Sequence, residues 1–190
     1  MRIALVCDYS LDYLGGAQSA FLDQARILRA RGHSVTIIAP ALRGDGGQKW
    51  VAAWRNGPGG VVPVPARVVL PGVDLPVVRN SKALRARLDE ELQSRRIDVV
   101  HLHSEFGLSA AVVAAAQSRG IPTVQTVHTF FWQAPMPRLA GVIAAAGVRG
   151  FTRWLRGFAA GDASLAVRPL DSALRNVTLS MGQRVDAVVS

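Results

Sequence analysis

Cysteine, lysine and long apolar runs are scarce in this 190-residue sequence, and each scarcity excludes a class of protein. The single cysteine, Cys7, has no partner for an internal disulfide, so we expect a reduced, cytoplasmic protein. No uninterrupted apolar run reaches the roughly 18 residues that a membrane-spanning helix needs. The apolar run from Ile3 to Cys7 is shorter than the hydrophobic region of a secretory signal, so we expect no signal peptide.

Acidic residues are also in the minority. The chain has 13 Asp and Glu against 22 Lys and Arg, which gives a formal net charge of +9. A basic surface attracts nucleotides, phosphates, anionic lipid head groups or nucleic acid, and charge alone does not choose among them. Because the chain lacks a lysine-rich tail and contains four tryptophans, we expect no nucleic-acid partner.

Apolar segments alternate with helix-like segments along the chain. Buried strands are predicted at 2–7, at 34–39 (ended by Pro40), at 97–102, in IPTVQTVHT and in VDAVVS. Helices are predicted at 17–31, 81–95, 107–119, 138–160 and 170–183. Continuous apolar strands joined by helices indicate an α/β fold, a Rossmann-like open parallel sheet with helices on both faces. Ligands of such sheets bind at the carboxyl ends of the strands.

Two glycines, Gly15 and Gly16, stand where the loop after the first strand becomes a helix. One interpretation is a tight turn together with a cap at the start of the helix. The other is that a negatively charged ligand approaches the backbone, because glycine leaves room and a helix start attracts anions. The spacing matches neither a P-loop nor a G-x-G-x-x-G motif, so both interpretations stay open on the residues alone.

Histidines follow two of the predicted core strands. His101, His103 and Glu105 alternate in HLHSEFG, and we expect His101 in the core, satisfied by a backbone carbonyl. His103 and Glu105 are expected beyond the strand end, within reach of solvent, as ligand contacts or loop-fixing hydrogen bonds. No H-E-x-x-H spacing exists, so a metal site is not predicted. His128 ends the next strand, where it could hydrogen-bond a hydroxyl or a developing charge.

The segment 138–160 combines apolar residues at helical spacing with arginines at 149, 153 and 156. A basic amphipathic helix with Trp and Phe can lie on an anionic membrane. Ordinary packing against the sheet or a second domain, with solvated arginines, is the alternative.

Five stretches in this order resemble the N-terminal domain of a GT-B glycosyltransferase of family 4. They are MRIALVCDYS…GGAQ, LRARGHSVTIIAP, DVVHLHSEFGLS, IPTVQTVHTFF and VDAVVS. The resemblance implies retaining transfer of a sugar from a nucleotide-sugar donor (a UDP- or GDP-sugar) to a sugar or lipid acceptor, without a metal or other cofactor. It also implies that residues 1–190 form one acceptor-side domain, half of a GT-B fold. The donor-binding C-terminal domain is expected to be absent, and this chain alone to be inactive.

The same resemblance assigns residues. Gly15 and Gly16 match the glycine loop that approaches the donor diphosphate, and His128 matches a histidine beside the transferred sugar, which makes it the catalytic candidate. The implied acceptor or sugar contacts are His103, Glu105, Phe106, Thr129 and Phe130. The implied membrane or acceptor surface consists of Arg149, Arg153, Trp154 and Arg156.

Two other functions remain open beside this one. The chain could be a non-catalytic module of the same fold that holds a sugar or a phosphorylated ligand. It could also be a membrane-surface module, in which case a cytoplasmic protein would lie peripherally at the inner face of the membrane.

Overall fold

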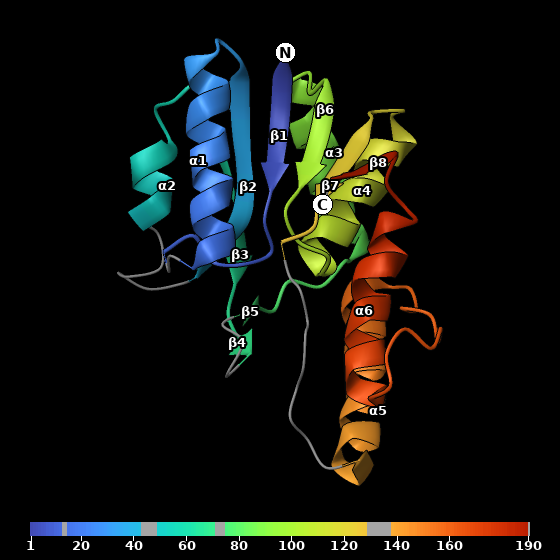
Figure 1. The fold of residues 1–190 in the computed structure, drawn as a ribbon. Coiled ribbons are helices and arrows are strands. Elements are labelled where there is room, and N and C mark those ends of the chain that lie inside the picture. Colours follow the sequence, from blue (N-terminus) through green and yellow to red (C-terminus); the bar gives the residue numbers. More distant parts are fainter. Residues whose placement is uncertain (13–14, 43–48, 71–74, 129–137, 190) are drawn as a thin grey trace.

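The computed structural model describes residues 1–12, 15–42, 49–70, 75–128 and 138–189. At its centre lies a six-stranded sheet in the order β3-β2-β1-β6-β7-β8, and every neighbouring pair is parallel (Figure 1). The strands are β1 (Arg2–Val6), β2 (Ser34–Leu42), β3 (Val61–Ala66), β6 (Val99–Leu102), β7 (Thr123–Thr126) and β8 (Ala187–Val189). A separate antiparallel pair joins β4 (Val69–Leu70) to β5 (Leu75–Pro76). The predicted fold class is confirmed.

Helices cover both faces of the sheet (Figure 1). They are α1 (Gly16–Ala30), α2 (Lys49–Trp54), α3 (Lys82–Ser94), α4 (Gly107–Ser118), α5 (Arg138–Arg156) and α6 (Pro169–Gly182). Each predicted helix is present, and Ser81 caps α3 with its hydroxyl oxygen 3.1 Å from the Leu84 amide. The fifth helix ends before residue 160 because Gly157 adopts a left-handed conformation, φ +80°.

Alternate residues of β1 enter two separate cores. Ile3, Leu5 and Cys7 pack with Phe21 of α1 and Trp50 of α2 on one face of the sheet. On the other face, Ala4 and Val6 pack with residues of α3, α4 and α6. Because both faces of the central strand are buried, β1 reads as an unbroken apolar run rather than an alternating one.

Proline 40 does not end the second strand, and that prediction was wrong. Strand β2 continues to Leu42, and Pro40 pairs with Val64 of β3. The neighbour on the other side, β1, has already ended at Val6, which pairs with Ile38. Beyond Ile38, β2 therefore pairs with β3 alone. The N–H that proline lacks would be needed only for pairing with a second neighbouring strand, which is absent at this position in the described part of the chain.

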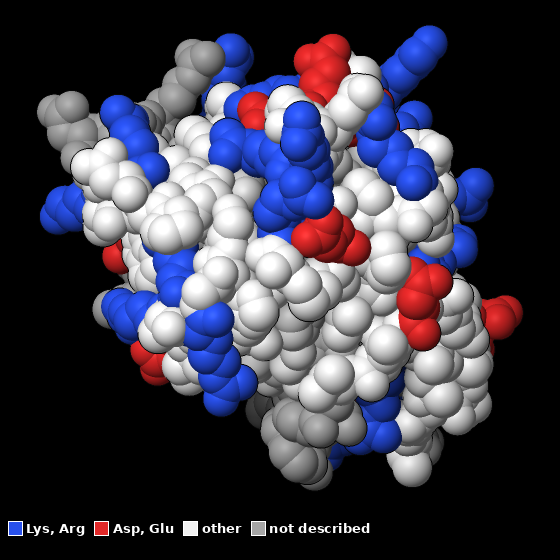
Figure 2. All heavy atoms as spheres, turned by 90° about the horizontal axis from the view of Figure 1, so that it is seen from above, with Lys and Arg blue, Asp and Glu red and all other residues white. Residues whose placement is uncertain are grey.

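The face at the amino ends of the strands carries scattered charges. Figure 2 shows Lys and Arg side chains spread over this face, with fewer acidic groups between them. Some of these cations are already paired, as Arg2 is with Asp98 at 2.8 Å. Excess positive charge by itself therefore does not mark a binding site.

Helix α4 begins in close contact with two other segments. A Cβ on Gly107 would overlap the carbonyl oxygen of Val78 and lie 2.9 Å from Leu155 Cγ. Gly107 is thus required by packing, because only a residue without a side chain lets the start of α4 approach this backbone.

We expect Gly107→Ala to lower the free energy of unfolding by about 1–3 kcal/mol, since neither neighbour can move away freely. The matched control is Gly16→Ala at the start of α1, where an added Cβ meets nothing within 4 Å. That control should leave stability unchanged or raise it by up to about 1 kcal/mol. Urea unfolding of both variants checks the contrast, and equal effects would contradict the packing argument.

Candidate functional site

The chain reverses direction across the sheet between β1 and β6. It runs outward from β1 through β2 to β3 and then returns to β6 on the other side of β1. The loop that follows β1 leads to Gly15, the loop after β6 holds residues 103–106, and His128 follows β7. All three predicted polar segments therefore lie at the carboxyl edge of the sheet, where open α/β folds bind ligands.

His103 and His128 are in direct contact. Nδ1 of His103 lies 2.6 Å from Nε2 of His128, and the His103 ring packs edge-on against Phe21 of α1. His103 is only 3% exposed, so the prediction that solvent reaches it was wrong. His128 is half-buried and lies two residues beyond the end of β7.

His101 completes a row of three imidazoles. Its ring centroid lies 4.6 Å from that of His103. Side chains hold it rather than the backbone carbonyl that we predicted: Nε2 is 2.7 Å from Thr126 Oγ1, and Nδ1 is 3.4 Å from Gln24 Nε2. His101 is also only half-buried, at the margin of the core rather than inside it.

The histidine cluster is electrically neutral near pH 7. Burial, with smaller contributions from the neighbouring imidazoles, lowers the pKa of His103 to about 2. Burial also lowers the pKa of His101 to about 4, with a smaller contribution from His128, and shifts the pKa of His128 downward. These side chains can therefore exchange hydrogen bonds with a ligand without contributing positive charge.

Glu105 is buried, at 3% exposure, where solvent access was predicted. Its carboxylate accepts a hydrogen bond from Thr178 Oγ1 of α6 at 3.0 Å. Burial raises its pKa to about 7. The neighbouring Phe106 is half-buried, and its ring meets Tyr9 edge-on at 6.1 Å between centroids.

Asp8 is the residue that sequence reasoning missed. It is 1% exposed and accepts hydrogen bonds from the hydroxyls of Ser104 (2.8 Å) and Ser109 (2.5 Å). The amides of Phe106 and Leu108 donate to it at 3.1 and 2.7 Å. Burial raises the pKa of Asp8, and the bonds to both serines and both amides oppose that rise. One carboxylate thus fixes the loop that carries His103.

Neither glycine at the start of α1 is required by the backbone. Gly15 has φ −93° and ψ 177°, an extended conformation open to any residue, and Gly16 is helical. An added Cβ on Gly15 would approach Gln18 Oε1 at 2.8 Å, the end of a flexible side chain, and one on Gly16 would meet nothing. Gly15 supplies no side-chain cap to the first amides of α1. Gly15 is nevertheless the N-cap residue of α1, so the helix-cap interpretation fits the structure, although no left-handed turn requires either glycine.

Helix α5 presents an exposed row that differs from the predicted surface. Leu139 and Ile143 are 76% and 67% exposed, and Val142, Arg149, Arg153 and Trp154 are exposed beside them. Arg156 is fully buried, where we predicted a surface arginine. Its guanidinium donates to the Val177 carbonyl at 2.9 Å and to Ser180 Oγ at 3.1 Å, both on α6. Burial lowers the pKa of Arg156 to about 10.

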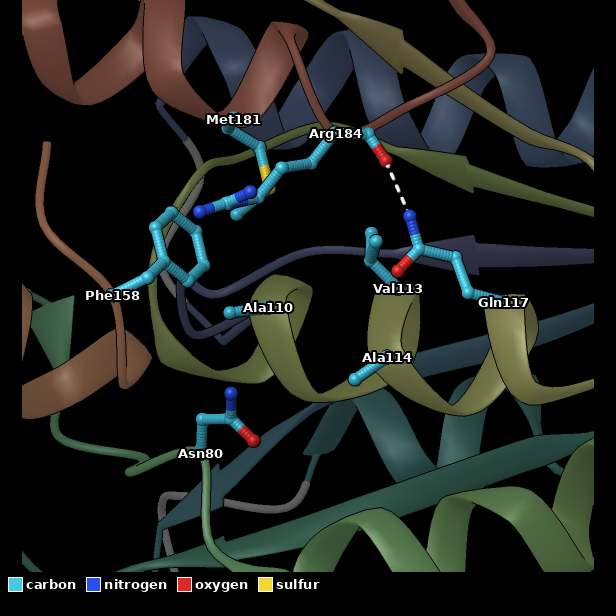
Figure 3. Close-up of a pocket in the computed structure, with 8 residues that line it drawn as sticks. All are labelled: Asn80, Ala110, Val113, Ala114, Gln117, Phe158, Met181 and Arg184. Carbon is cyan, nitrogen blue, oxygen red and sulfur yellow. Dashed lines mark hydrogen bonds between the residues drawn. The ribbon is translucent and has the colours of Figure 1, made fainter. Parts of the chain in front are cut away.

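A small cavity of about 180 Å³ lies elsewhere, between α4, α6 and the segment before α3 (Figure 3). Its lining residues are Asn80, Ala110, Val113, Ala114, Gln117, Phe158, Met181 and Arg184. The polar groups here already have partners, since Gln117 donates to the Arg184 carbonyl and Asn80 donates to that of Arg156. The cavity contains none of the predicted site residues.

The predicted contacts that follow His128 extend beyond the described part of the chain. Thr129 and Phe130, both predicted contacts, lie outside it. Within residues 1–12, 15–42, 49–70, 75–128 and 138–189, no group of three His, Cys, Asp or Glu side chains could hold a metal ion. Over the same residues, no helix is both long enough and apolar enough to cross a bilayer.

The sequence profile of Glycosyltransferase Family 4 matches residues 14–186. The chain belongs to this family. Residues 14–186 include the glycine doublet, the three histidines and helix α5, so the matched region covers every site residue predicted from the sequence.

Two relatives have names that include a lipid. A phosphatidyl-myo-inositol mannosyltransferase of Mycobacterium leprae is 33% identical over 137 residues, which is 68% of this chain and 32% of that protein. An alpha-monoglucosyldiacylglycerol synthase of Acholeplasma laidlawii is 29% identical over 131 residues, 69% of this chain and 30% of that protein. The chain thus spans about a third of the length of the curated relatives that it matches.

Among solved structures, Arabidopsis thaliana UGT89C1 in complex with UDP overlaps 99% of this chain and 44% of its own, at 13% identity and a TM-score of 0.48. That overlap is too loose to bear on function.

The buried carboxyl of Glu105 makes the free energy of unfolding of this protein depend on pH. The pKa of an unfolded glutamate is 4.5, whereas that of folded Glu105 is about 7. Between these values the folded protein keeps a proton that the unfolded chain has released, so this stability is complete at low pH and is lost as pH rises through 7. Relative to Glu105→Gln, wild-type stability should fall by about 3 kcal/mol between pH 4.5 and about pH 8.

Urea unfolding of both proteins across this pH range measures the difference. Glu90→Gln, on an exposed position of α3, is the control and should retain the wild-type pH profile. A Glu105→Gln profile parallel to wild type would contradict the raised pKa.

Proposed function

We propose that this chain is the acceptor-side domain of a retaining glycosyltransferase that transfers a sugar from a UDP- or GDP-sugar to a lipid acceptor at a membrane surface. The observation that carries this proposal is the start of α1, where two exposed glycines leave the first helix amides without a covering Cβ. The family assignment and the lipid named in both relatives support it.

The start of α1 is suited to the donor diphosphate. The first amides of a helix lack intrahelical acceptors, and the helix dipole adds partial positive charge there. Gly15 and Gly16 are both exposed, and a Cβ on Gly16 would point into open space. A diphosphate could therefore approach these amides if the flexible Gln18 side chain beside Gly15 turns aside.

His128 is the proposed contact to the transferred sugar. It is half-buried, it neighbours the loop after β6, and burial keeps it uncharged near pH 7. Because Nε2 contacts His103, the neutral ring has one nitrogen left for a sugar hydroxyl, and it does not attract a second anion.

We further propose that turnover requires a second domain and no metal. This domain offers the diphosphate backbone amides, whereas departure of a nucleoside diphosphate calls for strong positive charge around the leaving group. In curated relatives about two thirds of the length lies beyond the matched region, and a donor-binding half with such charges could be located there.

The acceptor side of the proposal rests on the exposed row of α5. Figure 1 shows the first turns of α5 extending past the rest of the molecule on the side where the strands end. Leu139, Val142 and Ile143 are exposed on these turns, and Arg149 and Arg153 follow within three turns. Apolar side chains at the tip with cations behind them fit an anionic bilayer, and this arrangement would bring a lipid head group toward the site.

The donor site is tested with Gly16→Asp. An acidic residue in the first turn should leave stability unchanged or raise it by about 0.3–1 kcal/mol, because it complements the helix dipole. It should also repel a diphosphate and weaken UDP or GDP binding at least tenfold. Amide shifts during nucleotide titration measure binding, and they should centre on residues 15–18 and His128 in the wild type.

Gly147→Asp is the control, since Gly147 also lies in a helix with nothing within 4 Å of an added Cβ. It should bind nucleotide as the wild type does. Nucleotide shifts confined to another part of the chain would contradict the donor site.

Membrane binding is tested by co-sedimentation with vesicles containing anionic phospholipid. Ile143→Glu should weaken binding at least tenfold because it removes apolar contact. Arg153→Glu should weaken it at least about fivefold, since each cation near an anionic surface contributes about 1 kcal/mol. Val167→Glu, at a position 93% exposed in the segment between α5 and α6, is the control and should have little effect. Equal losses in all three variants, or no binding by the wild type, would refute this surface.

A further inference from the structure

One nitrogen in the site is buried without a partner. Nε2 of His103 is inaccessible to solvent, and no atom in the described part of the chain hydrogen-bonds to it. The other ring nitrogen, Nδ1, contacts His128 Nε2 at 2.6 Å. This asymmetry between the two nitrogens decides where the proton of His103 resides.

The two rings meet edge to edge. Their centroids are 4.8 Å apart and their planes differ by only 18°. That separation is close to the 2.6 Å contact plus the two ring radii, so the nitrogens point at each other within nearly one plane. In-plane approach is the geometry of an N–H···N hydrogen bond, in which one imidazole must donate and the other accept.

His103 is the donor of this pair. A neutral imidazole carries one proton, and placing it on Nε2 would leave a buried N–H with no acceptor in the described residues. Buried orphan donors are rarer than under-satisfied acceptors, because lone pairs tolerate the loss of a partner better. The proton therefore belongs on Nδ1, where it is donated to His128.

We propose that His103 is a positioning residue that holds His128 as a neutral imidazole with its proton on Nδ1. Because Nε2 of His128 accepts from His103, the proton of His128 is left on the other nitrogen. Nδ1 of His128 has no partner among the described residues and remains available to a ligand. Protonating Nε2 as well would place two N–H groups face to face, so His103 also opposes the charged form. The lowered pKa of both rings agrees with this arrangement.

This inference rests on the proposed function only in the identity of the ligand that His128 contacts. In that setting His128 donates Nδ1–H to a hydroxyl or oxygen of the transferred sugar, and it does not act as a base through Nε2. Asp8 reinforces the arrangement by fixing the adjacent loop through Ser104 and Phe106.

The test reads the tautomers directly. Two-bond ¹⁵N–¹H correlation spectra of the histidine-labelled 190-residue chain, recorded without nucleotide or lipid, distinguish protonated from unprotonated ring nitrogens. We expect Nδ1 to be protonated in both His103 and His128, and Nε2 to be unprotonated in both. A wild-type His128 with its proton on Nε2 would overturn the proposal without any variant.

Substitutions separate positioning from packing. His103→Asn retains a short side-chain amide donor near the position of Nδ1, so His128 should keep its Nδ1–H tautomer. His103→Leu removes the donor, and His128 should then shift toward Nε2–H, with a pKa closer to its ordinary value. Thr126→Val removes the partner of His101 alone and should leave His128 as in wild type. An unchanged His128 tautomer in folded His103→Leu would refute the role of His103.

Nucleotide binding is measured separately from the tautomers. The predicted tautomer in a protein that does not bind nucleotide would leave this inference standing and overturn the proposed function. Nucleotide binding at residues 15–18 together with a proton on Nε2 of His128 would overturn this inference and leave the proposed function standing.

Discussion

The buried carboxylate of Asp8 joins the two central strands at the edge where the site lies. It follows β1, and it accepts hydrogen bonds from Ser104, Ser109 and the first amides of α4. Helix α4 has no local side-chain cap at Phe106, so this carboxylate caps the helix from a distant part of the chain. A charge buried without such donors would cost several kcal/mol, which makes the loop after β6 and Asp8 mutually dependent.

The position of the histidines follows from that constraint. The fixed loop places His103 against Phe21 of α1, and His103 in turn meets His128 after β7. Elements from three parts of the chain therefore determine the orientation of one half-buried imidazole. The histidines at this edge are neutral, whereas the first amides of α1 lack intrahelical acceptors and contribute partial positive charge. Such an edge suits a hydroxyl-rich ligand with an anionic tail.

Helix α5 shows how one amphipathic pattern can serve two surfaces. Leu155 and Arg156 point inward, and Arg156 is held by carbonyl and hydroxyl oxygens of α6. Its guanidinium also stacks on Phe158, 4.4 Å from the ring centroid. The opposite side, from Leu139 to Trp154, stays exposed, and there the Arg79 guanidinium lies 5.4 Å from the centroid of the Trp154 ring. An arginine in sequence is thus not evidence of a solvated face, because carbonyl groups of a neighbouring helix can satisfy it.

Hydrophobic periodicity by itself determined the order and type of the five predicted helices and five predicted strands, since each element of a two-sided α/β sheet must bury apolar residues at its own period. The positions of Gly15, Gly16 and His128 at loop boundaries could be predicted from the sequence for the same reason. Burial of His103, Glu105 and Arg156, and the joining of Asp8 to a loop almost a hundred residues away, were decided only by the tertiary structure. Those outcomes depend on which segments become neighbours across the sheet, and spacing along one segment contains no information about the partner that another segment will supply.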